Sequence, residues 1–402
     1  MTPRERFLLA MQNRVPDRVP CCPDFSNYIP CRRTGLPFWE IYFQNAVPLW
    51  RAYLSAADYF GTEAWIAASA GVPWIAENPR VEVQSTLVFD KAEDAMRRHT
   101  LIRTPDGDLT ATDLCLRGDP PSPIEKLMKD LPADFRKFRW LKVPPTAIDR
   151  GRWDEVKAEC DKRQQAFGVG IGYPGFQIWM VFAQGGIEPL AVAEMETPAI
   201  LEEWYELDLA VGTREMELII RERPDYILFG GSGTITLASP PLARKYAIPA
   251  LKKWTRMAKE AGIPTLLHSC GKQRLLADLL ADETDLDCVN PLEVAPMGDV
   301  DLAELKAARG RRLALMGNLH TTEVMLRGTP DLVRAKAKEA MRDAGVGGGF
   351  ILSTGDQCAR DTPDANLFAL VEAAREFGVY DRATGRLPRL AARAGKKRGR
   401  KG

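Results

Sequence analysis

The feature that most constrains the fold is the alternation of short apolar β-segments with helical stretches from residue 152 onward. Strands that alternate with helices favour parallel βα units. Eight such units in a chain of 402 residues predict an α/β protein with a closed (β/α)8 barrel rather than an open sheet. The β-segments lie near residues 19, 64, 168, 226, 264, 286, 312 and 349.

The helix starts carry a repeated signal in which Ser or Thr precedes proline. Ser and Thr are favoured N-caps, and proline is tolerated in the first helical turn. The pattern predicts capped helices at Thr2-Pro3, Thr197-Pro198, Ser239-Pro240, Thr329-Pro330 and Thr362-Pro363.

Residues 80–117 have strand-like composition, with the turn Thr104-Pro-Asp-Gly107 between two segments. They predict a β-meander inserted after the second barrel strand, with His99 as a surface residue. We expect residues 1–385 to form a single barrel domain. Residues 386–402 hold eight Lys or Arg and no acid, which predicts a disordered basic tail. A solvated tail is favoured over contact with nucleic acid or a membrane surface, and no specific nucleic-acid binding is expected.

Composition excludes several classes of protein. No apolar run approaches the length of a transmembrane helix, and the N-terminus lacks a signal-peptide core. These features predict a cytoplasmic protein without a membrane partner. The eight cysteines are too widely spaced for a disulfide scaffold. The glycine groups lack the G-x-G-x-x-G spacing of a dinucleotide site.

One β-segment ends in two metal-ligand residue types, in the stretch Thr265-Leu-Leu-His268-Ser-Cys270-Gly271. Residues i and i+2 of a strand point to the same side, so His268 and Cys270 leave the strand end together. The alternative interpretation is a hydrogen-bonded strand-end histidine beside a small core cysteine.

Other strand ends also carry polar or ligand-forming residues. Barrel active sites lie on the loops after the carboxyl ends of the strands, so these side chains should gather at one mouth. Zinc prefers Cys, His and carboxylate ligands, so the sequence predicts a zinc site there. The residues are Asp24 and Tyr28, Asn290 and Glu293, Asn318 and His320, and Asp356 and Cys358.

The same stretches carry a resemblance. From about residue 225 to 380, the chain resembles the uroporphyrinogen decarboxylase superfamily of (β/α)8 barrels. The likeness lies in His268-Ser-Cys270-Gly271, Met316-Gly-Asn-Leu319, Gly349-Phe-Ile-Leu-Ser-Thr-Gly355 and Asp361-Thr-Pro363. The N-terminal Met1-Thr-Pro-Arg-Glu-Arg and Asp17-Arg-Val-Pro20 resemble the same superfamily.

The resemblance implies a choice between two branches. Haem-pathway decarboxylases need no metal and carry an arginine-rich segment after the first strand, where this chain has Arg32-Arg33 outside that motif. The His-x-Cys pair is similar to zinc methyltransferases that work with methylcorrinoid proteins and use a later cysteine as third ligand. Here Asp356 stands at that position and Cys358 is the nearest cysteine. Asp356, Cys358 or Glu293 could complete the site, or no metal binds.

The leading hypothesis is therefore a zinc-dependent methyltransferase that moves a methyl group between a corrinoid and a small-molecule donor or thiol-type acceptor. His268, Cys270 and Cys358 are the predicted metal ligands. Glu293 and Asp356 are the predicted catalytic residues. The predicted substrate-binding residues are Asp24, Tyr28, Asn290, Asn318 and His320.

The chain has no Asp-x-His-x-x-Gly motif, so the corrinoid would arrive on a partner protein. Phe25, Tyr28, Trp39 and Tyr42 are expected in the core or, alternatively, in an apolar lid. The rival functions are a metal-free decarboxylase of a porphyrinogen or other acid, and a non-catalytic corrinoid- or tetrapyrrole-binding protein. The sequence gives no oligomeric state.

Overall fold

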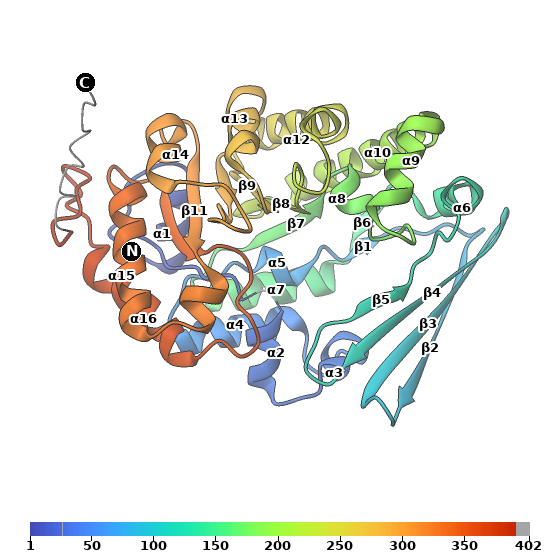
Figure 1. Ribbon diagram of the computed structural model, residues 1–402, viewed down its shortest axis with the longest axis horizontal. Coiled ribbons are helices and arrows are strands. Elements are labelled where there is room, and N and C mark those ends of the chain that lie inside the picture. Colours follow the sequence, from blue (N-terminus) through green and yellow to red (C-terminus); the bar gives the residue numbers. More distant parts are fainter. Residues whose placement is uncertain (26, 391–402) are drawn as a thin grey trace, which may run out of the picture.

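The computed structural model describes residues 1–25 and 27–390. Its central sheet has six parallel strands in the order β12-β11-β10-β9-β8-β7, so each strand lies beside the next one in the chain (Figure 1). This order, with a crossover between each pair, confirms the predicted α/β barrel architecture. The strands are β7 (Gly168–Gly172), β8 (Tyr226–Ser232), β9 (Thr265–Cys270), β10 (Cys288–Asn290), β11 (Ala314–Leu319) and β12 (Phe350–Thr354).

Helices pack around the outside of these strands (Figure 1). Those along the barrel are α1 (Pro3–Met11), α4 (Leu49–Phe60), α7 (Arg150–Lys162), α10 (Pro198–Glu222), α12 (Ile248–Glu260), α13 (Arg274–Glu283), α14 (Leu302–Arg309), α15 (Pro330–Ala340) and α16 (Asp364–Phe377). The other helices include α2 (Tyr28–Thr34), α3 (Phe38–Tyr42), α5 (Ala67–Ala70), α6 (Leu131–Phe138), α8 (Phe176–Trp179) and α9 (Ile187–Glu196).

The first two predicted strands are not ladder strands. Near residue 19, Cys21 makes an isolated parallel bridge with Leu352 of β12. Near residue 64 the chain is irregular, and the Glu63 N–H donates to the Cys21 carbonyl at 3.1 Å. Pro20 and Pro23 have no N–H to give to a ladder, which explains why the first segment does not pair along its length. Two irregular segments therefore fill the space between β12 and β7.

A buried ion pair holds these two segments. The Arg6 guanidinium donates to Glu63 at 2.6 Å, and their side chains are 4% and 2% exposed. The second Glu63 oxygen accepts from the Cys21 N–H at 2.7 Å. Arg6 also pairs with Asp17 at 2.7 Å. The N-terminal helix α1 is thereby fastened to both segments.

Three of the five predicted caps form. The Thr2, Ser239 and Thr329 hydroxyls each accept from a backbone N–H in the first turn of their helix. Thr197 and Thr362 do not: Thr197 makes no side-chain cap bond, and the cap position before α16 is Pro363. The Thr-Pro pattern marks these helix starts without supplying the bond.

The predicted meander is an antiparallel sheet in the order β2-β3-β4-β5, beside the barrel (Figure 1). Its strands are β2 (Glu82–Asp90), β3 (Ala95–Thr104), β4 (Gly107–Leu116) and β5 (Ser122–Glu125). His99 of β3 is exposed, and its Nδ1 lies 3.1 Å from the Thr112 hydroxyl. A two-stranded pair, β1 (Trp74–Ile75) and β6 (Ala147–Ile148), connects the meander to the barrel.

The described C-terminal residues pack on the barrel as far as residue 390. Leu387 is buried in the main core, and Arg389 donates to the Glu376 carbonyl at 3.2 Å. The rest of the predicted basic tail, residues 391–402, lies outside the described residues. No helix in the described part of the chain has the length and apolarity needed to span a bilayer.

Candidate metal centre and cavity

The register of strands β8, β9 and β10 determines which residues lie next to His268. His268 lies opposite Gly230 of β8 on one side and Asn290 of β10 on the other. These positions are the carboxyl ends of three neighbouring parallel strands, where barrel sites form. The register therefore brings His268 and Asn290 into contact although 22 residues separate them.

The tautomer of His268 follows from its neighbours. The Asn290 Nδ2 donates to the Met316 carbonyl at 3.3 Å, which leaves Asn290 Oδ1 as an acceptor. His268 Nδ1 lies 2.6 Å from that oxygen and so carries the hydrogen. In a neutral ring the lone pair is then on Nε2, the arrangement that metal-bound histidines use.

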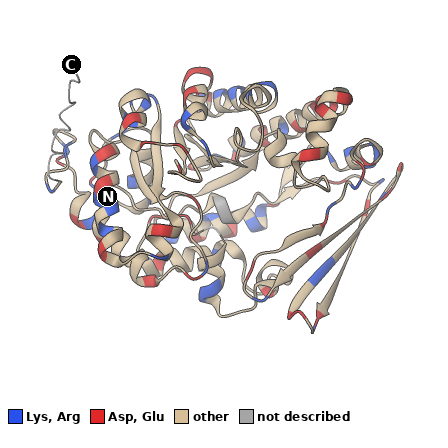
Figure 2. Cartoon of the chain, in the orientation of Figure 1, with Lys and Arg blue, Asp and Glu red and all other residues tan. Residues whose placement is uncertain are grey.

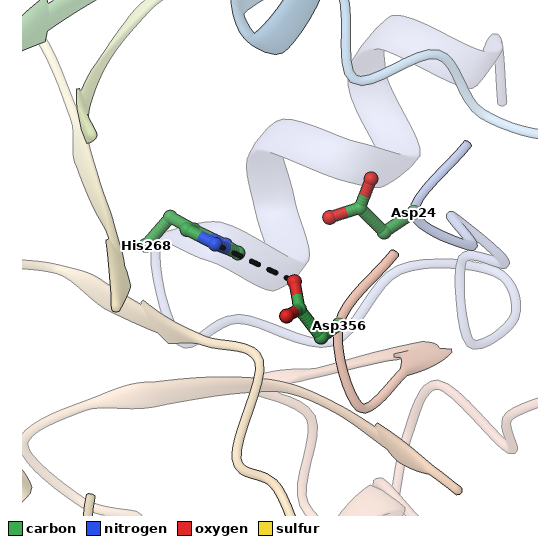
Figure 3. Close-up of side chains that lie close together, drawn as sticks. All are labelled: Asp24, His268 and Asp356. Atoms are coloured by element: carbon green, nitrogen blue, oxygen red, sulfur yellow. Dashed lines mark ion pairs between the residues drawn. The ribbon is translucent and has the colours of Figure 1, made fainter. Parts of the chain in front are cut away.

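His268 Nε2 faces Asp356, with 3.7 Å between Nε2 and the Asp356 Oδ1 (Figure 3). Two acceptors at this distance repel each other unless a proton or a cation lies between them. The Asp24 carboxylate faces the same space (Figure 3). Asp24, His268 and Asp356 form one group whose ligand atoms all lie within 4.8 Å of one another.

Asp356 belongs to a second group of the same kind, with Cys270 and Glu293. Its backbone has φ +96°, which non-glycine residues rarely adopt, and the Thr354 hydroxyl donates to its carbonyl at 2.7 Å. A conformation of this kind costs of order 1–3 kcal/mol and is typical of functional sites. Asp356 thus links the two groups.

Burial raises the pKa of the Cys270 thiol to about 11, and the charge of Asp356 adds to this rise. Hydrogen bonds from Ser232 and from the Gly233 N–H lower the pKa in part. Burial likewise raises the pKa of Glu293, while the Gly271 N–H, which donates to its carboxylate, opposes the rise. Both groups therefore hold their protons more tightly than they do in water, as long as no cation is nearby.

The predicted metal ligands are only partly brought together. Among the described residues, neither group holds both His268 and Cys270, because the histidine ring turns to Asn290 and the thiol to Ser232. Cys358 belongs to neither group. It is completely buried, its Sγ lies 4.0 Å from the Thr354 hydroxyl, and burial raises the pKa of its thiol to about 12. As third partner, the geometry favours Asp356 over Cys358.

A cavity of about 560 Å³ opens in front of His268 and Asp356. Small residues of β7 and β8 form one wall, including Gly170, Gly172 and Gly230. The other lining residues are Asp24, Asn27, Trp65, Ala67, Gly71, Ile171, Ile178, Leu228, Ser232 and Gln357. In the described chain, Cys270 and Glu293 are not in this lining and lie beside Asp356.

Three predicted substrate-binding residues lie elsewhere. Asn318 and His320 line a separate cavity of about 380 Å³ with residues of α15, which places that cavity in the outer helical layer. His320 Nδ1 accepts from the Thr322 and Glu323 N–H groups and so caps the helical turn that follows. Tyr28 packs against Phe38, with 6.4 Å between ring centroids.

The aromatic residues considered for a lid are mainly core. Phe25 and Trp39 are buried, and Phe25 packs against Tyr53 and Phe60. The Tyr42 hydroxyl donates to Asn27 Oδ1 at 2.7 Å and so reaches a cavity-lining residue.

Sequence reasoning missed Trp65, Gln273 and Gln357. The Trp65 ring packs against His268, with 5.5 Å between centroids. The Gln273 amide is buried and donates to the Asn290 carbonyl at 2.8 Å. Each residue lies outside a regular strand, so no periodicity marks its direction; only the proximity of Gln357 to Asp356 was a signal.

Neither arginine of the Arg32-Arg33 pair lines the cavity in the described structure. Arg32 donates to the Arg360 and Thr362 carbonyls at 2.8 and 3.0 Å and pairs with Asp364. Arg33 stacks on Tyr59, 3.4 Å from the ring centroid. Both guanidinium groups are committed to holding α2 against its neighbours.

The fold and the site define the class of protein: an α/β barrel that carries imidazole, thiol and carboxylate groups at the carboxyl ends of its strands. Within it, residues 227–377 match the uroporphyrinogen decarboxylase (URO-D) family, which confirms the resemblance over this part of the chain. The methylcobamide:CoM methyltransferase MtbA of Methanosarcina mazei is 31% identical over 196 residues, which are 47% of this chain and 51% of that protein. The chain thus spans about half the length of this curated relative.

Both branches of the superfamily occur among the relatives. A uroporphyrinogen decarboxylase of Pelodictyon phaeoclathratiforme is 30% identical over 139 residues, 33% of this chain and 37% of that protein. A solved structure described as a methyltransferase from Methanosarcina mazei superposes with a TM-score of 0.64 and 19% identity. It covers 94% of this chain and 99% of that one, so the fold extends well beyond the family match.

Proposed function

We propose that the protein is a zinc-dependent methyltransferase that moves a methyl group between a corrinoid, held by a partner protein, and a small sulfur compound. The observation that carries the proposal is the convergence of ligand atoms on one space: His268 Nε2 and Asp356 Oδ1 lie 3.7 Å apart, and Asp24 and Cys270 each belong to a ligand group with Asp356. The relatives named for methylcobamide:CoM methyltransfer support it.

The donor set fits zinc. His268 presents a ring nitrogen whose opposite N–H is hydrogen-bonded, Cys270 a thiol, and Asp356 and Glu293 carboxylates. We propose that Asp356, which belongs to both ligand groups, holds the ion together with His268 and Cys270, whose side chains turn toward it when the ion binds. Glu293 would take up or return the proton of the substrate. A bound zinc supplies Lewis acidity that keeps a thiol deprotonated near neutral pH.

The remaining residues position the substrate. Asn290 orients the His268 ring, and Gln273 fixes the loop after β10 through the Asn290 carbonyl. Asp24 and the glycine residues of β7 and β8 line the space in front of the site. The metal-free decarboxylase is less well supported, because a polycarboxylate substrate needs several guanidinium partners and Arg32 and Arg33 face other groups.

Metal analysis of the purified full chain tests the proposal. We expect about one zinc per chain, as in a site with protein ligands. Cys270→Ser should lose most of it, and Cys358→Ser, the matched control, should keep it. Zinc below about 0.1 per wild-type chain contradicts the proposal. In a second assay, the wild type should demethylate methylcobalamin in the presence of small thiols, whereas conversion of uroporphyrinogen would favour the decarboxylase instead.

A further inference from the structure

The Asp, Glu, Lys and Arg side chains in the described lining of the cavity are all of one sign. Asp24 and Asp356 are the carboxylates in its lining, and Glu293 and Cys270 adjoin Asp356. The described lining residues include no Lys or Arg, and Figure 2 shows most Lys and Arg positions on the outer helices. Among the described lining residues, an anionic ligand meets carboxylates and no guanidinium or ammonium group.

A bound divalent cation would add no cationic side chain to the described lining. The ion would be enclosed by Asp356 and the other thiol, imidazole and carboxylate groups of the site, which share its charge. A like charge brought into a partly buried cavity is repelled more strongly than in water, because the dielectric is lower. The wall of Gly170, Gly172 and Gly230 offers no compensating side chain.

The size of the cavity limits the ligand as well. A volume of about 560 Å³ accommodates a small organic molecule. Ile178 and Leu228 give part of the lining an apolar surface, and Asn27, Ser232 and Gln357 supply neutral polar groups. The cavity thus combines neutral hydrogen-bonding groups, aliphatic surface and negative charge.

We infer that this cavity takes a small neutral or cationic methyl donor or acceptor and discriminates against anionic ones. The inference rests on the proposed function, in that the ligand is the non-corrinoid partner of the transfer. Discrimination by charge is independent of turnover, so it can be measured by binding alone.

The test uses three ligands of equal length that differ in the charge of one end: 2-(methylthio)ethylamine, 2-(methylthio)ethanol and 2-(methylthio)ethanesulfonate. Their dissociation constants are measured by calorimetry on the full chain, both as purified and after loading with zinc. We expect the amine and the alcohol to bind at least about tenfold more tightly than the sulfonate. Tighter binding of the sulfonate, or binding of none of the three, overturns the inference.

A charge variant sharpens the test. Gln357 is a neutral lining residue, so Gln357→Lys adds a cation to the cavity, and Gln357→Met is its neutral control. We expect Gln357→Lys to improve sulfonate binding relative to the amine by about tenfold and Gln357→Met to keep the wild-type order. An unchanged ratio of the sulfonate and amine dissociation constants in Gln357→Lys contradicts the inference.

Turnover separates this inference from the proposed function. If sulfonate thiols are methylated faster than neutral ones, the methyltransferase stands and the charge preference falls. If the binding order holds but no thiol accepts a methyl group from methylcobalamin, the charge preference stands and the proposed activity falls.

Discussion

His268 Nδ1 lies 2.6 Å from Asn290 Oδ1, and this contact determines which ring nitrogen faces Asp356. The Asn290 side chain is completely buried and is held in turn by the Met316 carbonyl, so it has no freedom to turn over. An amide on β10 thereby sets the ligand properties of a histidine on β9.

Replacing Asn290 by Ala should therefore weaken zinc binding without removing a ligand. Loss of a partner that orients a ligating histidine costs about 10–100-fold in metal affinity. Asn290→Asp is the matched control, because it keeps an oxygen acceptor for His268 Nδ1 and should lose less. Competition with a chromogenic chelator measures both affinities; equal affinity in Asn290→Ala and the wild type would contradict the role of Asn290.

Zinc affinity should rise with pH. The pKa of Cys270 is about 11, so the metal-free thiol is protonated at neutral pH and releases its proton when the ion binds. At pH values well below that pKa, raising the pH by one unit increases the thiolate fraction about tenfold. This predicts a slope near +1 in the logarithm of zinc affinity against pH between pH 6 and 8. Cys270→Ser should lose that slope, and a flat profile in the wild type argues against a thiolate ligand.

Asp356 provides a test that separates stability from binding. Its φ of +96° is unfavourable for aspartate and readily adopted by glycine, so Asp356→Gly should raise the free energy of unfolding by about 1 kcal/mol. The same variant should lose zinc. Asp356→Asn keeps the strain and removes the charge, so it should lose zinc without a gain in stability. Urea unfolding and metal analysis on the three proteins give the comparison.

The buried pair of Arg6 and Glu63 should dominate the stability of the N-terminal region. Glu63→Gln removes the buried carboxylate that accepts from Arg6 and from the Cys21 N–H, while Arg6 keeps its pair with Asp17, so we expect a loss of about 1.5–3 kcal/mol. The control is Glu155→Gln, which breaks the exposed pair with Arg51 and should cost below about 1 kcal/mol. Similar losses in the two variants would show that the buried pair has no special role.

The sequence predicted the parts of the fold that repeat. Strands β7 to β12 follow from apolar segments separated by helices, and the outer helices follow from their caps. The segments near residues 19 and 64 have a composition similar to that of strands β7 to β12, but prolines and a buried ion pair give them an irregular conformation. Arg6 and Glu63 are 57 residues apart in the sequence, and no local sequence pattern predicts a pair at that separation.

The site was predictable to a similar extent. Strand ends correctly indicated where His268, Asp356 and Asp24 gather. They did not show which side of the barrel wall a residue faces, and the structure places Asn318 and His320 in the lining of a different cavity from that of His268. Trp65 and Gln357 come from irregular segments, where neither a period of 2 nor one of 3.6 applies.

The irregular closure between β12 and β7 has a consequence for motion. Asp24 and Trp65 belong to the two segments that fill this space. Part of the cavity lining therefore comes from the irregular segments of the barrel rather than from its strands. Few ladder hydrogen bonds hold that backbone, and such regions open with less free energy than a continuous sheet. We expect amides of residues 19–25 and 62–66 to exchange with solvent faster than those of β8 and β9. Faster exchange in these two segments would identify a hinge line through the binding site, and a ligand that contacts both segments should slow it.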